Sequence, residues 1–151
     1  MIYLAYGSNL NTRQMKRRCP LARVYGKGML YGYRLLFKGR KANAYATIEE
    51  KEGSAVPVLV WEITPEDERA LDFYEGYPRF YEKKMVEAVL ENGRSINGMV
   101  YIMTDGVIDR IEANLPSAIY FDVINQGYGM CGFDKKFLQD AIEDTKTKMK
   151  E

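Results

Sequence analysis

A short stretch near the N-terminus combines the residue types that bind an anionic group. Tyr6-Gly7-Ser8-Asn9-Leu10 follows the apolar run Ile2-Tyr3-Leu4-Ala5 and precedes a polar stretch that begins like a helix. A strand, a glycine, two small polar residues and a helix gather backbone N–H groups around one point, where they bind a carboxylate or an oxyanion. The same residue types are also common in tight turns without a function, so the pattern alone leaves both interpretations open.

A second candidate is Glu75, which precedes Gly76 at the expected end of a helix and is surrounded by Phe73, Tyr74, Tyr77 and Phe80. A carboxylate at a helix C-terminus opposes the helix dipole, and aromatic neighbours desolvate it. Both effects raise its pKa above the ordinary value of about 4.3, as a proton shuttle near neutral pH requires. Asp72, about one helical turn earlier, competes for this role and is expected to raise the pKa of Glu75 further.

Tyr120 is a third candidate, in the first turns of a helix that opens at Pro116-Ser117. The apolar pattern favours a core aromatic residue. The alternative is a phenol that points into a pocket as a hydrogen-bond donor.

The chain contains no histidine and only two cysteines, Cys19 and Cys131. Cations precede Cys19 and would lower its pKa, but no histidine is present to activate it as a nucleophile. We expect both cysteines to be small buried or half-buried residues, and we expect no metal site. If the chain is an enzyme, a carboxylate is therefore expected to move the protons.

Helix-capping residues and glycines predict the helices and strands that position the first loop and Glu75. Asn11 is expected to cap a helix that Cys19-Pro20 ends, and Thr64-Pro65 to open the helix that carries Glu75 and stops at Gly76. Glycines interrupt a strand-like stretch over 22–38, as a curled sheet or barrel requires. Other strands are expected at residues 2–6, 44–48 and 56–63, with residues 49–54 as the turn between the last two.

The second half of the chain predicts a hairpin and two helices. Residues 81–90 and 95–103 flank Asn92-Gly93, a type I′ turn signal. The helix opened at Pro116-Ser117 is expected to place Ile119, Tyr120, Val123 and Ile124 on one side and to end near Gly132. Asp134 is expected to cap the last helix. Hairpins mixed with helices predict an α+β fold.

The composition is that of an ordinary globular chain. The chain has 151 residues, of which 46% are hydrophobic and 28% are charged. Residues 1–151 are therefore expected to form a single domain. A formal net charge of +1 argues against nucleic-acid binding, so the basic clusters Lys16–Arg18 and Lys38–Lys41 are interpreted as solvated charge at element ends. Neither a signal peptide nor a membrane span is visible, so we expect a cytoplasmic protein without a membrane partner. The sequence leaves a homodimer open.

Three separated motifs resemble the γ-glutamylcyclotransferase family, including its AIG2-like and BtrG-like members. The first is Tyr3-Leu4-Ala5-Tyr6-Gly7-Ser8-Asn9-Leu10, with Met15 and the step Arg18-Cys19-Pro20 after it. The second is Leu71-Asp72-Phe73-Tyr74-Glu75-Gly76-Tyr77-Pro78, with Tyr81 beyond it. The third is Pro116-Ser117-Ala118-Ile119-Tyr120, followed by Gly127-Tyr128. Their order and spacing fit, and together they span nearly the whole chain. The glutathione-specific relatives resemble Tyr-Gly-Ser-Leu at the position of this motif. Asn9 in place of the leucine therefore argues against membership of that subgroup.

The resemblance implies a small mixed β-barrel flanked by helices, without cofactor or metal. It implies that the α-amine of a small γ-glutamyl substrate attacks its own γ-amide carbonyl and releases 5-oxoproline and an amino acid or amine. By motif match, Glu75 is the general acid and base. The segment Tyr3, Leu4, Ala5, Tyr6, Gly7, Ser8 and Asn9 binds the γ-glutamyl group, with Tyr120 in the same pocket.

Two alternatives stay open at this point. The first is a cyclotransferase for γ-glutamylamines or for a γ-glutamyl-capped metabolite, in which only the leaving-group pocket differs. The second is a module that binds a γ-glutamyl ligand without turnover.

Overall fold

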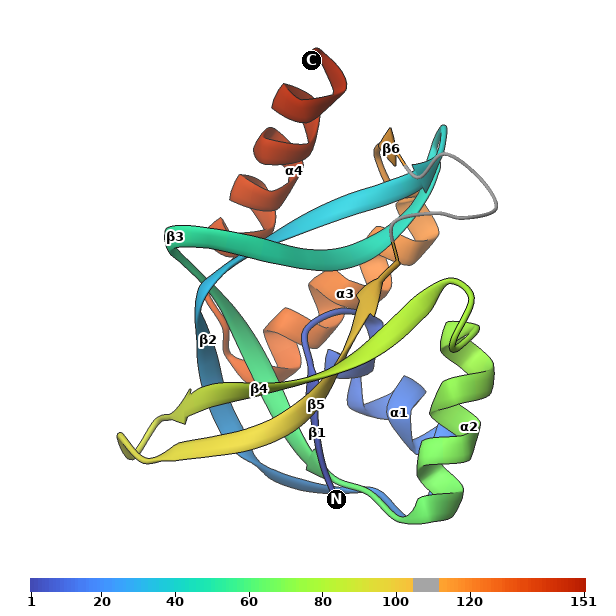
Figure 1. Cartoon of the computed structure of the whole chain (residues 1–151), viewed down its shortest axis with the longest axis vertical. Helices are drawn as coiled ribbons and strands as arrows, with labels where there is room; N and C mark the ends of the chain where they lie inside the picture. The colour runs from blue at the N-terminus through green and yellow to red at the C-terminus, as the bar shows by residue number, and fades with distance from the viewer. Residues whose placement is uncertain (105–111) are drawn as a thin grey trace.

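The structure of the chain is a computed structural model that describes residues 1–104 and 112–151. Five strands close into a mixed barrel in the order β3-β1-β5-β4-β2, because β2 also pairs with β3; the short strand β6 extends the β2 edge (Figure 1). β1 is antiparallel to β3 and parallel to β5, so the sheet is mixed as expected. The elements, in chain order, are β1 (Ile2–Ala5), the 3₁₀ helix η1 (Ser8–Leu10), α1 (Thr12–Arg18), β2 (Arg23–Arg40), β3 (Asn43–Glu62), α2 (Pro65–Glu75), β4 (Tyr81–Leu90), β5 (Ser95–Met103), β6 (Glu112–Ala113), α3 (Ala118–Cys131) and α4 (Lys136–Met149).

Local signals begin and end three of the helices as predicted. The Asn11 side chain accepts a hydrogen bond from the backbone of Gln14 at the start of α1. Thr64 and Asp67 form a reciprocal capping box at the start of α2, and Gly76 ends that helix in the left-handed conformation, with φ 64°. Ser117 caps α3, which ends at Gly132. The α2 signals determine where Glu75 lies.

Residues 49–54 do not form the predicted turn between two strands. β3 runs continuously from Asn43 to Glu62, and β2 and β3 bend together near these residues (Figure 1). Tyr31 faces Ala55 and Tyr33 faces Glu50, so Gly32 lies opposite the extra residues 51–54 of β3. Gly32 and Gly53 both have φ 83°, which permits this bulge and bend.

Three smaller predictions were wrong in detail. A type I′ turn needs a positive φ at both Asn92 and Gly93, but among the described non-glycine residues only Ala42 has a positive φ. The hairpin therefore turns through a three-residue loop that ends at Gly93, with φ 86°. α4 begins at Lys136 rather than directly after Asp134, whose carboxylate nevertheless accepts a hydrogen bond from the Lys136 N–H. Ile119 is 83% exposed and does not share the buried side of α3 with Ile124.

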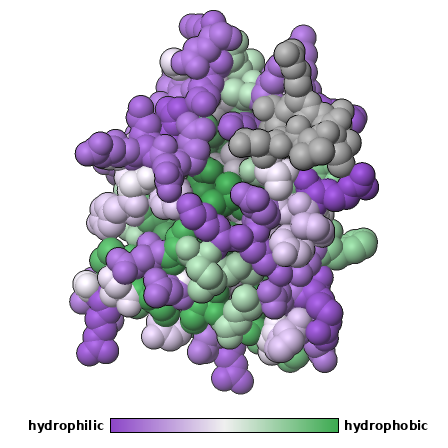
Figure 2. Space-filling model, viewed as in Figure 1, coloured by the Kyte–Doolittle hydropathy of each residue, from purple (hydrophilic) through white to green (hydrophobic). Residues whose placement is uncertain are grey.

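The helices cover the barrel unevenly. α1 contacts α2 and η1, α3 packs on η1, and α4 packs on β2. Hydrophilic side chains cover the end of the molecule that α4 forms (Figure 2). Cys19 and Cys131 are buried and unpaired, as expected. No helix within residues 1–104 and 112–151 is long and apolar enough to cross a membrane.

Candidate active site

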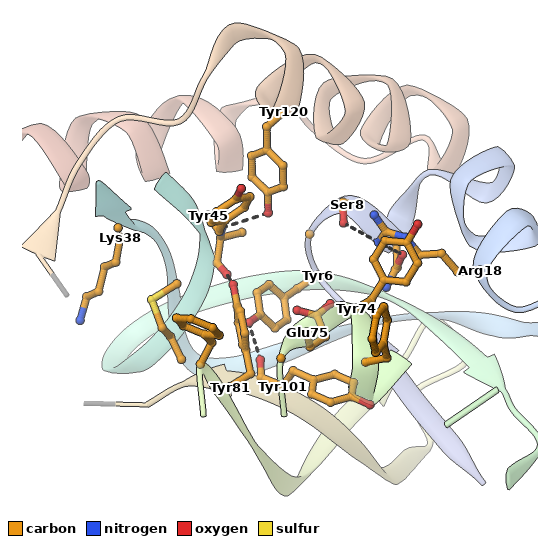
Figure 3. Close-up of a pocket in the computed structure, with 18 of the residues that line it drawn as sticks. Tyr6, Ser8, Arg18, Lys38, Tyr45, Tyr74, Glu75, Tyr81, Tyr101 and Tyr120 are labelled. Carbon is orange, nitrogen blue, oxygen red and sulfur yellow. Dashed lines mark hydrogen bonds between the residues drawn. The ribbon is translucent and has the colours of Figure 1, made fainter. Parts of the chain in front are cut away.

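The candidate site is a cavity of about 750 Å³ between the first loop of the chain, the end of α2, the start of α3 and the inner ends of several strands (Figure 3). Seven of the predicted site residues line it: Tyr3, Tyr6, Gly7, Ser8, Asn9, Glu75 and Tyr120. Segments more than a hundred residues apart in sequence therefore meet at one place. Leu4 and Ala5 do not line the cavity; they are buried in β1 as part of the core.

Glu75 is the last residue of α2 and points into the middle of the cavity (Figure 3). Burial raises its pKa to about 7, and the nearby charge of Arg18 acts in the opposite direction. A carboxyl group with this pKa exists in both protonation states near neutral pH. It can accept a proton in one step and donate it in the next.

Asp72 does not share the cavity with Glu75. Its carboxylate accepts a hydrogen bond from the Tyr101 hydroxyl at 2.6 Å and another from Lys83 Nζ at 2.9 Å. These bonds attach α2 to strands β4 and β5. The predicted contribution of Asp72 to the pKa of Glu75 is therefore wrong, because burial and Arg18 determine that pKa.

The loop after β1 is held rigidly and presents free donors. Leu10 and Asn11 donate their N–H groups to the carbonyls of Gly7 and Ser8 within η1. Within the described part of the chain, no group accepts a hydrogen bond from the N–H of Ser8 or Asn9. The buried Asn9 side chain donates to the Tyr3 hydroxyl at 3.0 Å, so its amide serves to fix the loop.

Arg18 lines the cavity, although the sequence analysis gave it only as part of the step after the first motif and not as a site residue. Its Nη1 donates to Ser8 Oγ at 3.2 Å and to Asn9 Oδ1 at 2.8 Å, and its guanidinium carbon lies 3.9 Å from the centre of the Tyr74 ring. Its Nε is buried and has no hydrogen-bond partner in the described ranges. Arg18 was assigned to a solvated basic cluster, but the start of α1 on Asn11 turns it toward the loop.

Tyr120 points into the cavity, where its hydroxyl accepts a hydrogen bond from the Ala46 N–H at 3.0 Å (Figure 3). Tyr81 donates to the Ala46 carbonyl at 2.7 Å, so two tyrosines hold one residue of β3. Burial raises the pKa of Tyr120, which keeps its hydroxyl protonated. That proton remains available for donation to a ligand.

Tyr45 and several other residues of the far wall were also missed. Two of them, Lys38 and Arg40, belong to the second cluster that was interpreted as solvated charge. Phe73, Tyr74 and Phe80 were expected as neighbours of Glu75 and do line the cavity. The other lining residues that were not predicted are Arg18, Lys38, Gly39, Arg40, Asn43, Tyr45, Ala46, Gly76, Tyr81, Tyr101 and Met103. Basic character and, for Arg18, its place after the first motif were the signals for the cations, but their positions depend on how β2 and α1 pack. The residues in ranges 1–104 and 112–151 contain no cluster of histidine, cysteine or carboxylate side chains placed to hold a metal.

The comparisons with known proteins agree with this geometry. A family model described as "Gamma-glutamyl cyclotransferase, AIG2-like" matches residues 3–120. A "Gamma-glutamylcyclotransferase" of Bos taurus is 30% identical over 162 residues, covering 99% of this chain and 84% of the relative. A "Gamma-glutamylcyclotransferase" of Homo sapiens is 29% identical over 134 residues, covering 83% of this chain and 69% of the relative.

A solved structure named "Gamma-glutamyl cyclotransferase" superposes with a TM-score of 0.82 at 26% identity, covering 93% of this chain and 85% of that one. It shares the closed mixed barrel with its flanking helices. The chain belongs to the AIG2-like γ-glutamyl cyclotransferase family.

Proposed function

We propose that residues 1–151 act as one γ-glutamylcyclotransferase domain with Glu75 as its general acid and base. The observation that carries this assignment is a carboxyl group with a pKa of about 7 that faces a cavity lined by the loop from Gly7 to Asn9. Family membership supplies the reaction class.

The reaction needs no nucleophile from the protein. The α-amino nitrogen of the substrate forms a bond to its own γ-carbonyl carbon, and the bond from that carbon to the leaving nitrogen breaks. The products are 5-oxoproline and a free amine or amino acid. Because the attack is intramolecular, proximity is largely built into the substrate, and the protein has to bind the extended γ-glutamyl chain in a folded-back shape.

Glu75 accepts and donates the protons that this reaction transfers. The α-ammonium group must lose a proton before its nitrogen can attack, and the ionised Glu75 carboxylate accepts it. The leaving nitrogen must gain a proton as its bond to the carbonyl breaks, and the protonated Glu75 donates it. The ring nitrogen loses a second proton as it becomes the lactam N–H, and the ionised Glu75 passes this proton to the released amine, which leaves as an ammonium ion. Glu75 returns to its ionised form, so no net proton stays on the enzyme.

Three groups support the binding of the γ-glutamyl part. The N–H groups of Ser8 and Asn9 and the hydroxyl of Tyr120 are donors without a described acceptor. Donors of this kind bind the α-carboxylate of the substrate or the oxyanion that forms on the γ-carbonyl oxygen. Tyr3 and Tyr6 shape the wall beneath them and hold the loop and β5 in place.

The test is 5-oxoproline release by Glu75→Gln, a change that keeps the shape of the side chain and removes the proton carrier. We expect the variant to fold and to lose activity by at least about a hundredfold, the usual range for a general acid–base residue. Glu66→Gln makes the same change in an exposed first-turn residue of the same helix and is expected to keep wild-type activity. Turnover by Glu75→Gln at the rate of Glu66→Gln would disprove the assignment.

A further inference from the structure

The cavity extends beyond Glu75 in two directions, and a cation lines it on each side. Figure 3 shows Arg18 at one end of the drawn site and Lys38 at the other, with Glu75 between them. From this arrangement, and resting on the proposed function, we propose that Lys38 determines leaving-group specificity by binding a carboxylate on the departing amine.

The Arg18 end suits the γ-glutamyl part of the substrate. The N–H groups of Ser8 and Asn9 lie at this end, and Arg18 donates a hydrogen bond to the side chain of each of these two residues. A substrate whose α-carboxylate lies here, with its γ-carbonyl near Glu75, directs its leaving group toward the opposite end. The groups that line that end therefore contact the leaving amine.

Lys38 lies at that opposite end, on β2, directly across from Tyr45 on β3. Both residues line the cavity, and the Lys38 side chain is 22% exposed. Among the described residues, Glu49 forms an ion pair with Lys38, with 3.7 Å between Lys38 Nζ and the carboxylate. The same carboxylate accepts two shorter hydrogen bonds from Arg34, at 2.8 and 2.6 Å.

Lys148 also shares Glu49, at 3.4 Å, so one carboxylate faces three cations. Burial acts to raise the pKa of Glu49, but the hydrogen bond from Arg34 and the three positive charges hold that pKa below its ordinary range. Glu49 is therefore ionised, and it is nearest to Arg34. Because Lys38 shares this one carboxylate with two other cations and has the longest contact to it, Lys38 Nζ is placed to bind an anionic group of the substrate.

Apolar side chains, among them Tyr45, Phe80 and Met103, also line the cavity. The Tyr45 ring lies across from Lys38 and packs edge-on against Tyr120 at a centroid distance of 5.0 Å. Apolar surface beside Lys38 lowers the local polarity and strengthens a charge pair there. The cavity therefore favours a γ-glutamyl amino acid over a γ-glutamylamine of the same carbon skeleton.

The experiment compares two substrates that differ only in the leaving-group carboxylate, γ-glutamyl-alanine and γ-glutamyl-ethylamine. We expect the wild type to prefer γ-glutamyl-alanine in kcat/KM by about tenfold or more, the scale of one charge-assisted hydrogen bond. Lys38→Met is expected to reduce this preference by about tenfold.

Lys148→Met is the matched control. It removes a cation from the same Glu49 carboxylate, but Lys148 does not line the cavity. We expect it to keep the wild-type preference. A general loss of stability or of charge near Glu49 would affect both variants, whereas direct recognition affects only Lys38→Met.

Lys38→Glu provides a second, independent test with γ-glutamyl-ethylenediamine, whose leaving group carries a positive charge. We expect this variant to prefer the cationic leaving group over alanine, the reverse of the wild type. Equal turnover of both γ-glutamyl-alanine and γ-glutamyl-ethylamine by the wild type would overturn the role of Lys38 and leave the proposed function intact. Absence of 5-oxoproline release from every substrate would instead overturn the proposed function.

Discussion

Glu75 combines the raised pKa that its sequence context predicts with a nearby Arg18 guanidinium that limits the increase, which the sequence context does not predict. Burial alone would raise the pKa of Glu75 further, and the positive charge of Arg18 opposes that increase. Arg18 itself is fixed by Ser8, Asn9 and the ring of Tyr74. The residues proposed to bind substrate and the residue proposed to move protons are thus electrostatically connected.

This connection predicts the pH dependence of activity. In the proposed mechanism the attack requires the ionised form of Glu75, so kcat/KM should rise with pH up to about 7 and then level off. Arg18→Met should move the midpoint of this rise to higher pH, because the charge that stabilises the carboxylate is lost. Arg18→Lys keeps the charge and should move the midpoint less. A pH profile of 5-oxoproline release for the three proteins checks this; identical midpoints would contradict it.

The same pKa predicts a stability effect at Glu75. The unfolded chain has an ordinary glutamate pKa, while the folded chain holds the proton up to about pH 7. Between pH 4.5 and 7 the folded state therefore binds more protons, and its stability falls as the pH rises through this range.

Glu75→Gln removes this penalty, so it should unfold at higher denaturant concentration than the wild type at pH 8. We expect a gain of about 1–2 kcal/mol, allowing for the partial exposure of the side chain. At pH 4 the gain should disappear. Denaturant unfolding at the two pH values measures it, and a gain of equal size at both would show that ionisation is not its cause.

At the scale of elements, the contact between α3 and η1 positions two parts of the site at once. A Cβ atom at Gly127 would lie 2.8 Å from the Asn11 backbone nitrogen and 2.8 Å from Leu10 Cβ. α3 carries Tyr120, and η1 carries Ser8 and Asn9. The absence of a side chain at Gly127 is therefore what lets both elements meet the cavity.

Gly127→Ala should separate these elements, destabilise the fold by about 1–3 kcal/mol and lower activity. Gly129→Ala is a close control in the same helix, because a Cβ there meets nothing within 4 Å. Alanine is the better helix former, so this change should stabilise the protein by up to about 1 kcal/mol. Thermal unfolding and 5-oxoproline release distinguish the two; similar effects would show that the close approach at Gly127 is not important.

At the scale of the whole molecule, barrel closure creates the cavity. The pairing of β2 with β3 brings Lys38 and Tyr45 together. β1 lies between β3 and β5 and leads into the loop from Gly7 to Asn9, at the Arg18 end of the cavity. α2 is tied to the barrel wall by Asp72, which bonds Tyr101 and Lys83. A ligand that spans the cavity touches most of the elements at once.

Product binding should therefore stabilise the entire fold. A ligand at a hundred times its Kd adds about 2.7 kcal/mol to the free energy of unfolding. We expect 5-oxoproline to raise the Tm of the wild type and of Glu75→Gln, since the substitution removes a proton carrier and leaves the loop donors. A shift in neither protein at saturating 5-oxoproline would place the product elsewhere.

The sequence by itself determined the local features of this protein. The caps at Asn11, Thr64 and Ser117, the helix end at Gly76 and the glycine-rich bending of β2 depend on residues a few positions apart, so short patterns were sufficient to predict them. Together with the three motifs, they also predicted the mixed barrel and the meeting of Glu75 with the first loop.

Only the tertiary structure decided which other residues reach the cavity. Arg18 and Lys38 resemble ordinary surface cations in sequence, and Leu4 and Ala5 resemble their cavity-lining neighbours. Alternation along β1 and the bend of the β2–β3 pair assign each side chain to the core, the cavity or the surface. These assignments depend on contacts between segments far apart in the chain, and no local pattern contains them.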